Sequence, residues 1–345
     1  MRRMLQIINA RVLDPATDQE YEADVLIEGE KIARIDRRWL KPSIALPGTQ
    51  VLDAHGAILA PALWDLHVHL REPGQERKET IATGALAAIR GGVGRLFAMP
   101  NTNPAVDNEK TLALVQEKAG EQESLVKIEF IAAVTQGRRG KTLTNIQRLA
   151  KLDAAAFSDD GSPVANERLL KQALEETRKA DSLVMDHAED LKLSANGVIN
   201  EGKTSRRLKL PGIPRESEIA AVRRDLKVLK TSRGRLHLCH ISTKEAVNLI
   251  RQAKTQGMAD RLSAEACPHH FALTDEAVIN WGPLAKVNPP LRTAEDVQAV
   301  REGLADGAID AIASDHAPHT NREKSQGMKK APFGLVGLET LLPAT

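Results

Sequence analysis

From about Ala57 onward, short apolar runs of strand length alternate with helical patterns, and this alternation constrains the fold more than any other feature. The eight runs are ILAPALWDLHVH, GRLFAMP, VKIEFIAAVT, AAAFSDD, SLVMDH, RLHLCH, LSAEACP and IDAIASDH. A helical or loop segment follows each of the first seven, with clear periodicity in NERLLKQALEETRKA and TAEDVQAVREGLADG. Alternating strands and helices form parallel βα units, and eight units close a barrel. We therefore predict an α/β fold with a (β/α)8 TIM-like barrel over residues 57–345.

The first 56 residues have a different pattern, which predicts a small β domain. LQIINARVLD, ADVLIEGEKIARID and TQVLDAHG are short alternating runs broken by turn residues, as in antiparallel, sandwich-like β structure. The chain ends at ETLLPAT, and VGLETLLPAT is too short for a complete barrel helix with its cap and return. We therefore expect a truncated last helix and an incomplete β domain.

Charge and composition exclude several classes of function. The chain has 48 Lys and Arg against 46 Asp and Glu, and its short basic clusters are scattered, so no nucleic-acid surface is indicated. It contains neither a signal peptide nor about 18 consecutive apolar residues, which predicts a cytoplasmic protein that does not bind membranes. Cys239 and Cys267 lack CxxC spacing and are interpreted as core residues.

Polar residues end the predicted strands, where a barrel of this kind has its active site. His67 and His69 end the first run, Asn101 follows the second, and Asp159 and Asp160 end the fourth. Three more strand ends carry His187, His240 and Asp315.

The spacing of His67 and His69 points to a metal site. Side chains two residues apart on a strand face the same side, so both imidazoles can bind one ion. Four histidines and two aspartates suffice for two hydrolytic zinc ions that share a bridging carboxylate. Spacing alone leaves the choice between Asp159 and Asp160 open. We interpret His237 and His55 as structural, and the pattern CPHHF favours the same role for His269 and His270.

Ten motifs together resemble dihydroorotase, in its long bacterial form within the amidohydrolase superfamily. They run in order from about residue 50 to the end of the chain: DLHVHLREPG, AMPNTNPAVDN, FSDDGSPV, MDHAED, NEGKTSRRLKLPGIP, HLCHISTKEAV, CPHHF, KVNPPLR, AIDAIASDHAPH and APFGLVGLET. The resemblance implies reversible, zinc-dependent ring closure of N-carbamoyl-L-aspartate to L-dihydroorotate in de novo pyrimidine synthesis.

The resemblance also implies roles for individual residues. His67, His69 and Asp315 would hold the first zinc ion, His187 and His240 the second, and Asp160 would bridge them, with Asp315 also moving the proton. The residues expected to bind substrate are Arg71, Asn101 and His319 at its carboxylate, and Asn288, Phe333 and Gly334 at its ring. An arginine is a natural bidentate partner for a carboxylate.

Two alternatives remain open at this point. Hydantoinases and allantoinases resemble this architecture but bridge their metals with a carbamylated lysine, whereas AAAFSDDG ends without a lysine. A non-catalytic scaffold for aspartate carbamoyltransferase would lose metal ligands, and this chain keeps all six. A homodimer and a carbamoyltransferase partner are also open. The segment KSQGMKKAPFG is basic where the resemblance implies acidic or aromatic residues.

Overall fold

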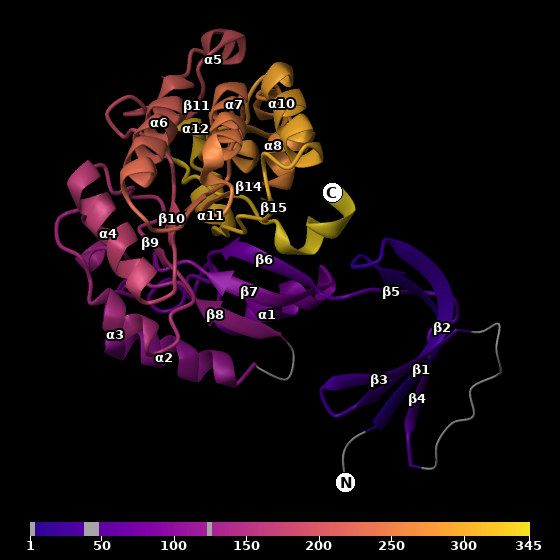
Figure 1. Ribbon diagram of the computed structural model, residues 1–345. Coiled ribbons are helices and arrows are strands. Elements are labelled where there is room, and N and C mark those ends of the chain that lie inside the picture. The colour runs from indigo at the N-terminus through magenta and orange to yellow at the C-terminus, as the bar shows by residue number, and fades with distance from the viewer. Residues whose placement is uncertain (1–3, 38–47, 123–125) are drawn as a thin grey trace. The chain divides into compact units, whose positions relative to one another are not determined.

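The structure is a computed structural model that describes residues 4–37, 48–122 and 126–345 (Figure 1). It divides into two compact units, Met1–Leu63 and Trp64–Thr345. The strands of the first unit are β1 (Met4–Asp14), β2 (Gln19–Glu28), β3 (Lys31–Arg37), β4 (Gln50–Asp53) and β5 (Ile58–Leu59).

The first unit is built on one five-stranded sheet with the order β3-β2-β1-β4, and β5 also pairs with β1. β1 and β2 are antiparallel, as are β2 and β3, which confirms the predicted pattern for these three strands. The prediction is wrong for β4 and β5, which pair with β1 in parallel. Alternation shows which side chains face the core but not which way a neighbouring strand runs. Ile7, Ala10, Val12, Ala23 and Val25 form the core of this sheet.

The second unit contains a strand within each of the eight predicted runs. They are β6 (Leu63–Val68), β7 (Val93–Ala98), β8 (Lys127–Phe130), β9 (Phe157–Ser158), β10 (Val184–Asp186), β13 (Leu236–Leu238), β14 (Leu262–Ala266) and β15 (Ala311–Ile312). They form a three-stranded sheet, β6-β7-β8, and a five-stranded sheet, β15-β14-β13-β10-β9. Strand pairing in the five-stranded sheet is parallel, as it is between β7 and β8, so the predicted α/β class with parallel strands is confirmed.

Helices follow the strands in the order that the sequence predicts (Figure 1). They are α1 (Ile81–Arg90), α2 (Glu109–Gly120), α3 (Ile146–Ala150), α4 (Glu167–Lys179), α5 (Lys203–Leu208), α6 (Glu216–Thr231), α7 (Lys244–Ala253), α8 (Pro268–Ala272), α9 (Ala277–Trp281), α10 (Ala294–Ala305), α11 (Asn321–Lys324) and α12 (Gly327–Lys330). A small parallel pair, β11 (Ile199–Asn200) and β12 (Gly212–Ile213), lies between β10 and α6 in the chain.

Helix α4 illustrates why these segments are helical. The Asn166 side chain caps its N-terminus by accepting hydrogen bonds from the backbone N–H groups of Arg168 and Leu169. Its buried residues, Leu170, Ala173, Leu174 and Thr177, recur at helical spacing. Among the described residues, no helix is long and apolar enough to cross a membrane.

A buried cluster joins five neighbouring strand segments of the second unit. Met99, Ile131, Ala156, Met185 and Cys239 pack together. Each lies on or beside a different strand, namely β7, β8, β9, β10 and β13. Because close-packed interiors resist deformation, this core fixes the relative positions of the residues that follow these strands.

Candidate metal centre

Six buried side chains gather at the carboxyl ends of five strands. His67 lies on β6 and His69 directly after it, and the others follow β9, β10, β13 and β15. They are His67, His69, Asp160, His187, His240 and Asp315, and each is at most 5% exposed. The structure therefore brings together all six side chains that the sequence predicted as metal ligands.

Asp160 lies at the centre of this cluster. Its Oδ1 is 3.5 Å from His67 Nε2, 3.4 Å from His187 Nδ1 and 3.6 Å from His240 Nε2. Its other oxygen, Oδ2, is 3.6 Å from His69 Nε2. One carboxylate thus faces all four imidazoles, which is the arrangement that a bridging ligand requires.

Asp315 faces the same cluster from the segment that follows β15. Its Oδ1 lies 3.0 Å from His69 Nε2 and 3.6 Å from His67 Nε2. Asn101 supports the other side of the His69 ring, since its Oδ1 accepts from Nδ1 at 2.8 Å while its Nδ2 donates to Asp160 at 3.2 Å. His69 is therefore oriented with Nε2 toward both carboxylates.

Several atoms in the cluster lack hydrogen-bond partners. Among the described residues these include His67 Nε2, Asp160 Oδ1 and His240 Nδ1, all of them buried. A buried polar atom without a partner is costly, so such atoms mark places where a further group fits. His67, His69 and Asp315 place their ligand atoms within 4.8 Å of one another, as do His67, Asp160 and His240. These residues therefore fit a cation with nitrogen and oxygen ligands.

Two further carboxylates support the imidazoles from outside the cluster. Glu265, at the end of β14, accepts from His67 Nδ1 at 2.7 Å and from His237 Nε2 at 3.1 Å. Glu189 accepts from His187 Nε2 at 2.9 Å and from Asn288 Nδ2 at 2.9 Å. Histidines that bind metals commonly donate their second N–H to a carboxylate in this way. Sequence reasoning missed both glutamates, although each lies at or just after a predicted strand end.

The electrostatics of the cluster favour cations. Burial by itself would raise the pKa of the Asp160 carboxyl, but the charge of His67 and contacts with His187 and His240 hold that pKa well below its usual value. Burial disfavours the charged form of His187, yet Asp160 and Glu189 raise its pKa to about 10. Without a metal, protons on His67 and His187, whose pKa values are raised, supply the positive charge that these carboxylates attract.

Three residues in or beside the cluster adopt left-handed backbone conformations. The φ angles are 63° for Arg71, 36° for His240 and 46° for Asp315. Residues other than glycine rarely occupy this region, and such strain commonly accompanies functional sites. The surrounding packing therefore holds these side chains in positions that an unstrained strand end would not give.

A cavity of about 230 Å³ opens on the cluster. Its lining includes all six predicted substrate residues: Arg71, Asn101, Asn288, His319, Phe333 and Gly334. Arg71 is buried, and its Nε donates to the backbone oxygen of Pro318 at 3.3 Å. His319 Nε2 donates to the backbone oxygen of Phe333 at 2.7 Å. Burial and the neighbouring Arg71 lower the pKa of His319 to about 4, so its ring is neutral at neutral pH.

The loop at Phe333 and Gly334 is held by two lysines. Lys286 Nζ donates to the backbone oxygens of Met328 and Ala331, at 2.7 and 2.6 Å. Lys324 Nζ donates to three backbone oxygens, including that of Pro332 at 3.1 Å. A Cβ at Gly334 would lie 2.4 Å from the Ala317 oxygen, so the loop requires glycine there. Lys324 thus gives the basic segment before this loop a structural role.

The remaining candidates lie outside the cluster. Asp159 turns away and accepts from the Thr135 backbone N–H at 3.0 Å, so geometry favours Asp160 as the residue among the imidazoles. His237 bonds to Ser263 and Glu265, and the side chain of His55 is exposed. His269 and His270 form a separate buried group with Cys267.

Comparison with known proteins reveals close relatives along nearly the whole chain. A family profile described as Dihydro-orotase-like matches residues 56–246. The chain is 44% identical over 338 residues to a protein from Endomicrobium trichonymphae named Dihydroorotase, which covers 98% of this chain and 78% of that protein. It is 46% identical over 336 residues to one of the same name from Pelotomaculum thermopropionicum, covering 97% and 77%.

Solved structures with the same fold belong to more distant proteins. An L-hydantoinase (dihydropyrimidinase) from Arthrobacter aurescens superposes with a TM-score of 0.83 at 24% identity, covering 100% of this chain and 76% of that one. A D-hydantoinase superposes with a TM-score of 0.81 at 22% identity, covering 99% and 75%. At these identities the similarity shows the fold alone.

Proposed function

The chain belongs to the dihydroorotase family, and on that premise we propose that it interconverts N-carbamoyl-L-aspartate and L-dihydroorotate in pyrimidine biosynthesis. One observation carries the proposal beyond family membership. Four imidazoles surround Asp160 at the base of a cavity that also contains a buried arginine, Arg71. A hydrolytic centre and a partner for a carboxylate therefore share one small cavity, as a carboxylated cyclic amide requires.

The cofactor in this proposal is a pair of zinc ions. One ion would be bound by His67, His69 and Asp315. The other ion would be bound by His187 and His240, and Asp160 would bind both ions. The donor set supports this assignment, since imidazole and carboxylate are ligands that hydrolytic zinc accepts. When bound, the ions supply a hydroxide nucleophile at neutral pH and polarise the ring carbonyl.

The residues of the chain then bind the substrate and move the proton. Arg71, with Asn101 and His319, binds the ring carboxylate, while Asn288, Phe333 and Gly334 contact the ring. In hydrolysis a water oxygen adds to the ring carbonyl carbon, and Asp315 takes the proton that this water releases. Asp315 delivers the proton to the ring nitrogen as the carbon–nitrogen bond breaks. Cyclisation is the reverse sequence.

We also propose that the eight strands close into a barrel. Single parallel bridges, Val68 with His316 and Ala132 with Phe157, connect both ends of the three-stranded sheet to the five-stranded one. They support closure of the eight strands into a barrel, whose carboxyl-terminal face would carry the site. We keep 1–56 and 57–345 as the two domains, near the boundary at Leu63. A cytoplasmic location, a homodimer and a carbamoyltransferase partner stay predictions.

The test measures ring opening of L-dihydroorotate and ring closure of N-carbamoyl-L-aspartate, together with the zinc content of the purified chain. We expect both reactions, with about two zinc ions per chain. Hydantoin and allantoin serve as comparison substrates, and we expect slower turnover because β9 is followed by Asp159 and Asp160, with no lysine. A folded protein with neither bound zinc nor dihydroorotate turnover would instead be a scaffold, and faster hydantoin hydrolysis would identify a hydantoinase.

A further inference from the structure

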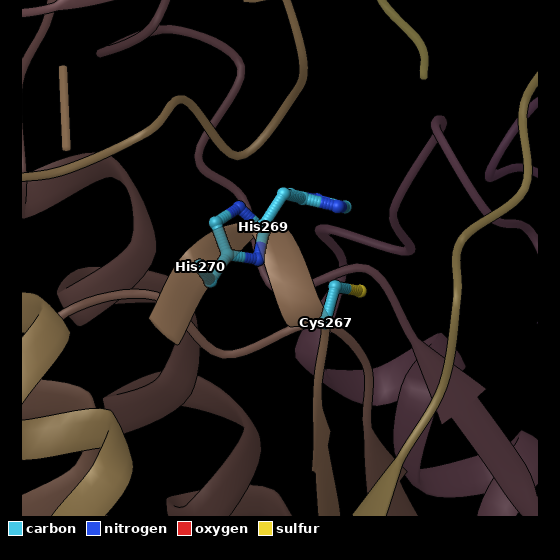
Figure 2. A group of neighbouring side chains, drawn as sticks. All are labelled: Cys267, His269 and His270. Atoms are coloured by element: carbon cyan, nitrogen blue, oxygen red, sulfur yellow. The ribbon is translucent and has the colours of Figure 1, made fainter. Parts of the chain in front are cut away.

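A second group of side chains of the types that bind metals lies where β14 turns into α8. Figure 2 shows its three members, Cys267, His269 and His270, all on one short stretch of chain. Cys267 occupies the N-cap position of α8 without a side-chain capping hydrogen bond, and the two histidines lie in the first turn of the helix. One ligand atom from each residue lies within 4.8 Å of the other two. None of the three belongs to the cluster around Asp160.

Both imidazoles carry a buried nitrogen without a partner. His270 Nε2 donates to the backbone oxygen of Pro289 at 2.9 Å, so in the neutral ring Nδ1 carries the lone pair. Among the described residues, neither His270 Nδ1 nor His269 Nε2 has a hydrogen-bond partner. His270 is 1% exposed and His269 is 9% exposed. Leaving two such buried nitrogens unsatisfied is costly. An ion bound through His270 Nδ1 and, in the tautomer with the proton on Nδ1, through His269 Nε2 would satisfy both.

The chemistry of the three groups selects the ion. A thiol and two imidazoles are a soft set of donors, as in zinc sites with mixed cysteine and histidine ligands. Bonds of about 2.0–2.3 Å hold tetrahedral ligand atoms roughly 3.5 Å apart, so modest rotations of the side chains would place all three on one ion. Burial raises the pKa of the Cys267 thiol, and a bound divalent cation offsets this by displacing the proton.

The surroundings leave room for an ion to reach the group. A cavity of about 580 Å³ is lined by Pro268 and His269. A water molecule in this cavity could complete a tetrahedral shell beside His269. His270 can bind through Nδ1 while Nε2 still donates to Pro289, so binding does not require that hydrogen bond to break.

We propose that Cys267, His269 and His270 form a further cation site, separate from the catalytic cluster, for a zinc-like divalent ion. The site lies outside the substrate cavity and needs neither Asp160 nor Asp315. Metal binding at this site can therefore be distinguished from metal binding at the catalytic centre. If this proposal is wrong, the proposed reaction is unaffected.

Cobalt(II) provides the test, because a thiolate ligand gives cobalt a charge-transfer band in the near ultraviolet. The chain has only two cysteines, so the sulfur that binds can be identified. Chelator-treated protein is titrated with cobalt(II) as wild type, Cys267→Ser and Cys239→Ser. Cys239 is the necessary control because its sulfur lies within 4.8 Å of ligand atoms of His67 and Glu265. We expect the band in wild type and Cys239→Ser and its loss in Cys267→Ser.

Stoichiometry and a histidine variant complete the design. Cys267→Ser should bind one cobalt ion fewer per chain than wild type and keep its dihydroorotate hydrolysis. His269→Gln retains both cysteines and should weaken or shift the band. A wild type without the band, a band that survives in Cys267→Ser, or an unchanged spectrum and stoichiometry in His269→Gln would each overturn the proposed ligand set.

Discussion

His67 donates a hydrogen bond from Nδ1 to Glu265 Oε1 at 2.7 Å, and neither residue is exposed to solvent. The bond fixes the ring so that Nε2 points to Asp160 and Asp315, at 3.5 and 3.6 Å. The negative charge of Glu265 also makes that nitrogen a better ligand. Glu265 thus orients His67, a proposed metal ligand, without lining the cavity on the cluster.

Glu265→Gln should weaken metal binding. Glutamine keeps the length of the side chain but loses its charge, and loss of such an outer carboxylate typically costs about 10–100-fold in metal affinity. The measurement is zinc affinity by competition with a chromophoric chelator. Glu302→Gln, at an exposed position on α10, is the matched control and should leave affinity unchanged. Equal affinities in the two variants would show that Glu265 does not support the centre.

The neighbouring aspartates Asp159 and Asp160 should respond differently to the same substitution. Asp160→Asn removes the charge that faces four imidazoles, so zinc content should fall. Asp159→Asn changes a side chain that bonds to Thr135 instead, so the folded variant should retain its zinc. Elemental analysis of both variants, checked for folding by circular dichroism, makes the comparison. A normal zinc content in Asp160→Asn would rule out its bridging role.

Asp315→Asn should separate metal binding from turnover. Asparagine can still occupy the position beside His69 but cannot accept and return a proton at neutral pH. We expect the variant to keep at least the zinc ion assigned to His187 and His240 in the proposal, while its kcat falls by about 100-fold or more. Steady-state kinetics with parallel zinc analysis provide the measurement. A near-normal kcat would mean that another group carries the proton.

The predictable and unpredictable parts of this site differ for physical reasons. His67 and His69 were recognisable because strand parity places both side chains on one face. The side chains of Asp159 and Asp160 point to opposite sides. The sequence therefore shows that one of them can face the four histidines, but not which one. Glu265 carried no such signal, since a carboxylate at a strand end is equally compatible with an ion pair.

In the fold, features set by local sequence were predictable, whereas features set by contacts between distant segments were not. All eight strand positions were predictable, because each apolar run and the helix after it are local features. The parallel pairing of β4 and β5 with β1 was not, because it depends on which distant segment reaches the edge of the sheet. Burial of Lys324 was also not predictable, since a basic segment normally predicts an exposed surface.

Arg71→Lys should mainly raise the KM for L-dihydroorotate. Lysine keeps the positive charge but loses the planar fork that binds a carboxylate with two parallel hydrogen bonds. We expect this contact to be equally strong in the ground state and the transition state, so its loss should raise KM with little change in kcat. Arg77→Lys, at an exposed position, is the control. An unchanged KM in Arg71→Lys would show that another group binds the carboxylate.

His319 makes the stability of the fold depend on pH. Burial and the positive charges of Arg71 and Lys78 lower its pKa to about 4, whereas an unfolded histidine titrates near 6.5. Between these values the unfolded chain binds more protons than the folded one, so the free energy of unfolding falls as pH decreases from about 6.5 to about 4.

His319→Gln should remove this component of the pH dependence. Glutamine can still donate to the Phe333 oxygen but does not titrate. From about pH 7.5 to about pH 4.5, wild type should lose about 1–2 kcal/mol more unfolding free energy than the variant, after allowing for solvent screening. Urea denaturation at both pH values gives the difference, with His55→Gln as control because the His55 side chain is exposed. Since both proteins share every other titrating group, parallel pH profiles would mean that His319 accepts its proton at a similar pH in the folded and unfolded states.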